Sequence, residues 1–186
     1  MRALSASLLI GLSLALAGRY HVPDATTPLH FPRDQASHDD ARLEWWYVTG
    51  HLEEAGGKRF GFELTFFRSG VLDAPREKGA SPFTARDLVL AHLAFTDGAA
   101  GSFRYEERIH RPMAGAARVS EEHLDASIED WRLEEVGSTL VLRAGEELSL
   151  VLVPLKPLVL HGENGLSKKG GAPDAVSRYV SYTRLS

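Results

Sequence analysis

Two neighbouring segments, residues 43–52 and 60–68, constrain the fold of this chain more than any other feature of its sequence. Both are dense in aromatic and β-branched residues, and two of the three tryptophans stand side by side in the first segment. This composition favours strands. Because side chains alternate between the faces of a strand, we expect Trp45 and Tyr47 on one face and Trp46 on the other. Both faces carry bulk, so this strand is expected to separate a core from a second buried or ligand-filled space.

Further short β-type runs, separated by turn signals, follow along the chain. A Gly-Gly pair at residues 56–57 suits a hairpin between the first two runs. Residues 85–94 have a composition that fits a helix, although their apolar positions fit a strand equally well. The expected strands, about eight in all, cover residues 43–52, 60–68, 88–96, 102–109, 124–133, 139–143, 148–153 and 178–185. Their number and spacing predict an all-β protein, an antiparallel barrel or sandwich with little helix.

The first 17 residues have the pattern of an export signal. An uncharged run rich in Leu and Ala follows a single basic residue and ends in Ala-Leu-Ala, the small-x-small pattern that signal peptidase accepts. The run is shorter than the roughly 20 apolar residues that span a bilayer. We therefore expect export to the periplasm or the outside of a bacterial cell, with an uncleaved membrane anchor as the alternative. Residues 18–40 are expected to be extended and to precede one domain, residues 41–186.

Charge and composition exclude several classes of function. Without residues 1–17 the chain holds 20 Lys and Arg residues against 25 Asp and Glu, so nucleic acid is not expected as a partner. The absence of cysteine excludes thiol catalysis, disulfides and thiolate metal sites. No pair of histidines has a metal-binding spacing, and neither a Gly-x-Ser-x-Gly elbow nor a phosphate-binding loop occurs. We expect neither a metal nor a cofactor.

Two carboxylates fall within the most apolar predicted strands. Glu44 and Glu63 would be costly to bury there without a partner. A buried carboxyl group with a raised pKa could act as a general acid. The alternative is a structural ion pair with Arg42, Arg68 or Arg184.

Five blocks of the sequence resemble, in order, a known family. They are EWWYVTGHL with FGFELTFFR (residues 44–52 and 60–68), AHLAFTD (91–97), EDWRL (129–133), KPLVLHG with GLSKKG (156–162 and 165–170), and YVSYTRL (179–185). Together they are similar to the AttH/CrtC-type lipocalin-like proteins, a family that includes the carotenoid 1,2-hydratases (hydroxyneurosporene synthases). The resemblance implies a lipocalin-like antiparallel β fold that family members carry in two copies, of which this chain corresponds to the first.

The resemblance also implies an apolar isoprenoid or lipid-like ligand. In the hydratases the residues proposed for catalysis lie in the second half, so the resemblance assigns no catalytic residue here. The side chains expected to contact a ligand are Trp45, Tyr47, His51, Glu63, Phe67 and His92.

Three functions follow as alternatives. The first is an exported module that binds an apolar ligand, and the second is part of a cofactor-independent hydratase completed by a missing or separate C-terminal domain. The third is a structural half-domain from a truncated gene. A second lipocalin-like domain or self-association would then cover the faces left open.

Overall fold

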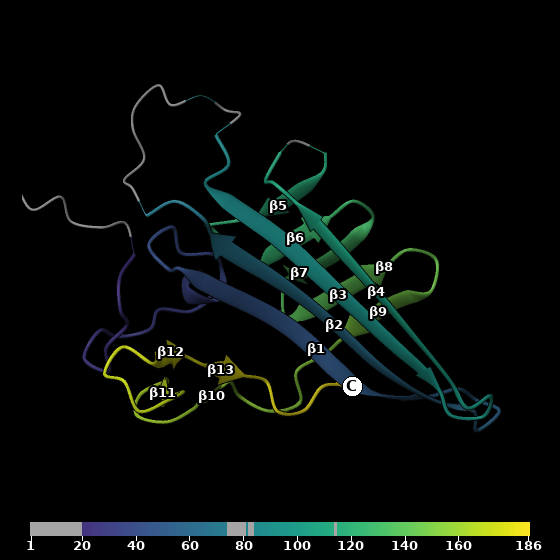
Figure 1. The fold of residues 1–186 in the computed structure, drawn as a ribbon. Helices are drawn as coiled ribbons and strands as arrows, with labels where there is room; N and C mark the ends of the chain where they lie inside the picture. The colour runs from purple at the N-terminus through teal and green to yellow at the C-terminus, as the bar shows by residue number, and fades with distance from the viewer. Residues whose placement is uncertain (1–19, 74–80, 82–83, 114) are drawn as a thin grey trace, which may run out of the picture.

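The computed structural model describes residues 20–73, 81, 84–113 and 115–186, and two antiparallel sheets dominate this part of the chain. Four long strands in sequence order form the first sheet: β1 (Leu43–Glu53), β2 (Arg59–Gly70), β3 (Asp87–Asp97) and β4 (Ser102–His110). Five shorter strands form the second: β5 (Ala117–Val119), β6 (Asp125–Ile128), β7 (Trp131–Val136), β8 (Thr139–Ala144) and β9 (Leu148–Leu152). Figure 1 shows the long strands of the first sheet crossing the second sheet.

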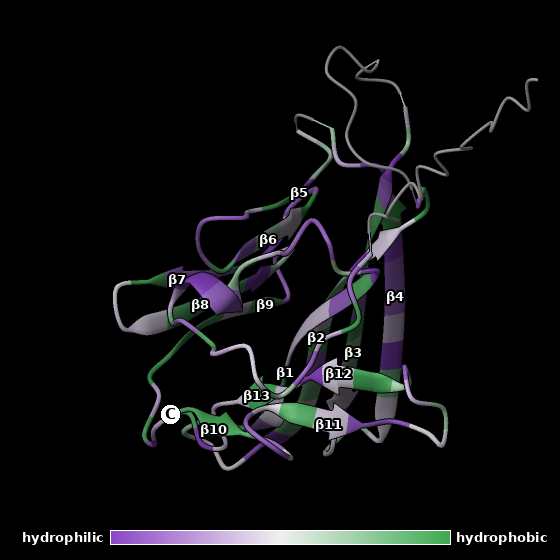
Figure 2. Cartoon of the chain, turned by 90° about the vertical axis from the view of Figure 1, so that its left-hand side faces the viewer, coloured by the Kyte–Doolittle hydropathy of each residue, from purple (hydrophilic) through white to green (hydrophobic). Residues whose placement is uncertain are grey.

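Two small ribbons complete the fold at its C-terminal end. Strand β10 (Val159–Leu160) pairs with β13 (Val180–Ser181), and β11 (Leu166–Lys168) pairs with β12 (Val176–Arg178). Both views place these ribbons beside β1 (Figures 1 and 2). Within the described residues the only helical element is the single 3-10 turn η1 (Arg33–Gln35), which follows a cis peptide bond between Phe31 and Pro32.

The hydrophobic core fills the space between the two sheets. Alternate residues of β1–β3 and of β5–β9 point inward and are mostly apolar, whereas the corresponding positions of β4 are Arg104, Glu106, Arg108 and His110. The largest fully buried apolar side chains come from both sheets and are Trp131, Phe66, Leu64, Ile128, Leu142 and Val89. Because these side chains pack against one another, the interior is a filled core.

The structure confirms the predicted all-β fold and most of the predicted strands. The hairpin at Gly57, whose φ is 81°, and the strand character of residues 88–96 are as expected. Of the two predicted architectures the chain adopts two packed open sheets, not a closed barrel.

Two predicted strands, residues 178–185 and 124–133, are wrong. Residues 178–185 contain only the last residue of β12, the two residues of β13 and an isolated bridge at Leu185. Residues 124–133 form two strands and not one. The chain turns at Glu129, which has φ 53°, and at Asp130, so that β6 and β7 form a hairpin. The short strands β5, β10 and β11 were not predicted, because two or three residues give no recognisable alternation. The predicted export signal lies outside the described residues. Within those residues, no helix combines the length and the apolar character that crossing a membrane requires.

Candidate functional site

The register of the first sheet brings all six predicted ligand residues to one face. Trp45 lies opposite Phe67, and Thr65 lies between Tyr47 on one side and His92 on the other. Glu63 and His51 continue the same face along β2 and β1. We call this face, which points away from the second sheet, the outer face. That these side chains touch a ligand stays a prediction.

Apolar side chains form one row across the outer face. The row joins all four strands and consists of Trp45, Phe67, Leu90 and Ile109. Ile109 is 56% exposed and the other three are half-buried. The next row along the strands is polar and consists of Tyr47, Thr65, His92 and Glu107. The outer face therefore presents an apolar strip bordered by hydrogen-bonding groups.

Aromatic contacts of His92 reach Phe67 in the apolar row and Tyr105 in the row beyond the polar one. The His92 ring lies 5.2 Å from the Phe67 ring and 5.7 Å from the Tyr105 ring, in both cases tilted. The His92 Nε2 is 3.9 Å from a Glu107 carboxylate oxygen. A tilted arrangement of this kind places ring edges against ring faces, which favours contact between aromatic groups. His92 therefore sits among aromatic side chains and is not an isolated surface histidine.

The C-terminal ribbons cover the end of this face near β1. The hydroxyl groups of Tyr47 and Tyr179 are 2.6 Å apart, and the His161 ring stacks on Tyr179 with 4.4 Å between centroids. The hydrogen bond to Tyr179, together with partial burial and the nearby charge of Glu63, raises the pKa of Tyr47 to about 12. Tyr47 is therefore a neutral hydroxyl at physiological pH.

A lysine lies next to the same aromatic groups. The Lys169 Nζ is 4.9 Å from the Tyr179 ring centroid and 6.0 Å from that of Trp45, both within range of cation–π attraction. The sequence reasoning did not single out Lys169, Tyr179 or His161 as site residues. The one available signal was their presence in the family blocks, which says nothing about which strand they approach.

Glu63 and His51 do not extend the aromatic cluster. Glu63 is exposed, accepts a hydrogen bond from Thr65 Oγ1 at 3.0 Å, and makes no ion pair among the described residues. The expectation that it is a buried carboxyl group or belongs to an arginine pair is wrong, because its side chain points away from the core. His51 lies at the far end of β1, two rows beyond Tyr47, and is exposed.

Glu44 belongs to a different environment on the core side of β1. Its carboxylate lies 2.8 Å from Arg68 Nε and 2.8 Å from His38 Nδ1, and it accepts a hydrogen bond from the Ser37 hydroxyl at 2.9 Å. Burial alone would raise the pKa of Glu44, but these hydrogen bonds and the Arg68 charge outweigh it and lower the pKa. The ion pair with Arg68 is confirmed, and the alternative of a protonated general acid at this position is wrong.

The tandem tryptophans of β1, Trp45 and Trp46, have different surroundings. Trp46 packs against the core, and its indole Nε1 donates a hydrogen bond to the Gln35 carbonyl at 2.8 Å. Trp45 is directed to the outer face, so the prediction that the two tryptophans lie on opposite faces of the strand is confirmed. Among the described residues no group of three or more acidic or histidine side chains is placed to hold a metal ion.

Two packed antiparallel sheets are consistent with a lipocalin-like β fold. Within that class the chain belongs to the AttH-like family, whose family model matches residues 22–186. Membership agrees with the AttH part of the resemblance seen in the five sequence blocks.

A crystal structure of an AttH protein from Nitrosomonas europaea is similar to this chain. The two share 36% sequence identity and superpose with a TM-score of 0.74 over 86% of this chain. This chain spans 48% of the length of that protein. No curated protein sequence matches the chain significantly.

Proposed function

We propose that the outer face of the first sheet binds an apolar ligand of the isoprenoid or lipid type. The observation that carries this proposal is the apolar row of Trp45, Phe67, Leu90 and Ile109 directly beside a polar row on the same face. Neighbouring strands lie about 4.8 Å apart, so a row across four strands extends over about 14 Å. A strip of this shape suits a linear hydrocarbon chain better than a compact polar molecule.

Partial exposure of the large side chains supports the proposal. Phe103 and Tyr105, on the same face as Ile109, are 65% and 53% exposed. Covering apolar area contributes about 25 cal/mol per Å², so a hydrocarbon chain laid across these side chains would be bound by their removal from water. The polar groups of Tyr47 and Lys169 would meet the head group of the ligand at the end covered by the C-terminal ribbons.

We place the ligand on the outer face of the first sheet and not in the space between the two sheets. A closed barrel of eight strands could hold a small apolar molecule inside it. Here the space between the sheets is occupied by Trp131, Phe66 and Leu64, all fully buried. We further propose that the protein is exported, and that a second lipocalin-like domain or a second copy of the chain can cover the outer face. The greater length of the N. europaea protein supports the former partner.

Native mass spectrometry with a carotenoid, a polyprenol and a long-chain fatty acid tests ligand binding. We expect saturable one-to-one binding of at least one of these, weakened about tenfold or more by Trp45→Ala, since burying an aromatic side chain contributes more than the 1.4 kcal/mol of a tenfold change. Val151→Ala, which shortens an exposed apolar side chain of the second sheet, is the matched control and should bind normally. If none of the three compounds binds saturably, the proposal of ligand binding is refuted.

A second candidate function is water addition to a carbon–carbon double bond, carried out together with a further domain. It is favoured by the length of the N. europaea protein, about twice that of this chain. Such a reaction needs a protonated acid in a dry pocket and water to capture the cation. Glu44 cannot supply the proton because its pKa is lowered, and Glu63 is exposed to water.

The acid of a hydratase would therefore come from the additional domain. Chromatography of a carotenoid incubated with this chain alone should show no hydrated product. The same assay after mixing with the C-terminal half of a two-domain relative should show it. If the mixture yields no hydrated product, the hydratase function is refuted. The proposal of ligand binding is unaffected, because native mass spectrometry tests it separately.

A further inference from the structure

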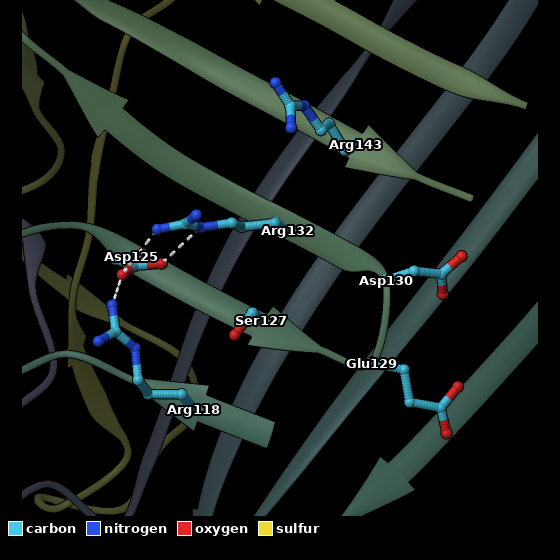
Figure 3. Close-up of a pocket in the computed structure, with 7 residues that line it drawn as sticks. All are labelled: Arg118, Asp125, Ser127, Glu129, Asp130, Arg132 and Arg143. Atoms are coloured by element: carbon cyan, nitrogen blue, oxygen red, sulfur yellow. Dashed lines mark hydrogen bonds and ion pairs between the residues drawn. The ribbon is translucent and has the colours of Figure 1, made fainter. Parts of the chain in front are cut away.

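A row of arginine and serine side chains crosses the second sheet on the face that points away from the first sheet. The register aligns one residue from each of the five strands: Arg118, Ser127, Arg132, Arg143 and Ser149. Their strand neighbours point into the core, so this row faces solvent. An open cavity of about 400 Å³ lies along it, and four of these residues line the cavity (Figure 3).

A buried carboxylate holds two of the three guanidinium groups in place. The Asp125 side chain is 1% exposed and lies 3.0 Å from Arg132 Nε, and it also pairs with Arg118. The Nη2 of Arg132 contacts Glu134 at 2.7 Å. Paired in this way, the guanidinium groups lose little further conformational freedom when they bind a ligand.

Three donor groups in the middle of the row have no partner among the described residues. They are the Ser127 hydroxyl, the Nη1 of Arg132 and the whole guanidinium group of Arg143. Arg132 and Arg143 lie directly opposite each other on neighbouring strands, an arrangement of like charges that destabilises a sheet. A bound anion would remove this repulsion.

The two remaining acids that line the cavity are engaged elsewhere. Glu129 lies 2.7 Å from His110 Nε2 and 3.1 Å from Arg108 Nη1, and Asp130 pairs with Arg108 as well. Figure 3 shows the Glu129 and Asp130 side chains at the end of the cavity opposite Asp125, directed away from Arg143. They therefore leave the charge of Arg143 uncompensated.

We propose that Ser127, Arg132 and Arg143 form a binding site for an oxyanion carried by a small soluble molecule. Arg118 and Arg132 are balanced by Asp125 and Glu134, so Arg143 leaves one positive charge, which a singly charged carboxylate or phosphate diester neutralises. The planar guanidinium fork donates two parallel hydrogen bonds to such a group. The site lies on the second sheet and is independent of the outer face of the first.

NMR titration of the full chain tests the site, with sodium acetate or dimethyl phosphate replacing sodium chloride at constant ionic strength. Saturable shifts of the Ser127, Arg132 and Arg143 amides are expected, and comparing the two anions identifies the preferred oxyanion. Arg143→Gln should weaken binding about tenfold or more, since a hydrogen bond to a charged group contributes about 1.5–3 kcal/mol. Arg143→Lys, which keeps the charge and loses the fork, should weaken it less.

Arg104→Gln is the matched control, because Arg104 is an exposed arginine of β4 that pairs with Glu147 outside the row. Its binding should equal that of the unaltered chain. Shifts that grow linearly without saturating, or equal affinity in Arg143→Gln, would overturn the proposal. Circular dichroism of each variant establishes that the sheet is intact, which is expected because Arg143 is exposed and unpaired among the described residues.

Discussion

Replacement of Glu44 by glutamine removes the charge at the centre of the network that joins the N-terminal segment to the first sheet. The carboxylate lies 2.8 Å from Arg68 Nε and accepts a hydrogen bond from the His38 backbone N–H at 2.9 Å. The Arg68 side chain is only 3% exposed, so its guanidinium group cannot turn to water when this partner is lost. The variant therefore leaves a buried cation with one carboxylate fewer.

The loss in free energy of unfolding caused by Glu44→Gln depends on which other partners Arg68 retains. Removing one partner of a buried ion pair costs about 3–5 kcal/mol. Arg68 retains the Asp87 carboxylate, 2.8 Å from Nη1, and donates from Nη2 to the carbonyls of His38 and Ala41. We therefore expect the lower end, about 3 kcal/mol. For a chain of this size each kcal/mol lowers Tm by about 2–4 °C, so the expected decrease is about 6–12 °C.

Thermal unfolding followed by circular dichroism, at pH 6 and moderate ionic strength, measures this effect. Glu53→Gln is the control, because Glu53 pairs with Arg59 at 2.9 Å and both side chains are exposed. An exposed pair contributes about 0–1 kcal/mol, so the control should shift Tm by no more than about 4 °C. If Glu44→Gln unfolds at the same temperature as this control, the reasoning that the buried Arg68 depends on its carboxylate is refuted.

Three further predictions concern other parts of the fold. The hydrogen bond to Glu44 raises the pKa of His38 against the opposing effect of burial, so its stabilisation is complete below the unfolded value of 6.5 and is lost as pH rises through the folded value. Urea titrations should show the free energy of unfolding falling above pH 6.5, with this component absent in His38→Gln; an unchanged slope would contradict the pairing. Phe66→Ala, at a fully buried position, should cost about 3–5 kcal/mol in the same assay, and a loss below 1 kcal/mol would show that the core there is not packed. Tyr47→Phe should speed hydrogen exchange of the β12 and β13 amides by loosening their link through Tyr179, as measured by mass spectrometry; unaltered exchange would mean that the ribbons are held by other contacts.

Strand positions could be predicted because their signals are local. The density of aromatic and β-branched residues defined β1 and β2 to within two residues at each end. The same reasoning failed at residues 124–133, where Glu129 and Asp130 interrupt the alternation of apolar and polar residues at the turn. That turn depends on a left-handed backbone conformation at a residue type that gives little warning of it.

The candidate site could be predicted only in part. Alternation along β1 and β2 was enough to place Trp45 and Phe67 on strand faces, but not to place His92 beside them. That required the β2–β3 register, which sets Thr65 opposite His92. Tyr179 could not be predicted, because its hydroxyl meets that of Tyr47 across 132 positions of sequence and through ribbons of two or three residues.

The sequence by itself determined the all-β class, the family, and which side of β1 each tryptophan occupies, because side-chain alternation has a period of two residues and needs no distant partner. Only the tertiary structure decided that the strands form two open sheets, that Glu44 is neutralised by Arg68, and that three arginines from separate strands share one row. These features depend on pairing and register between distant segments. A shift of two residues in register leaves every side chain on its face but changes every neighbour, so the local pattern cannot specify it.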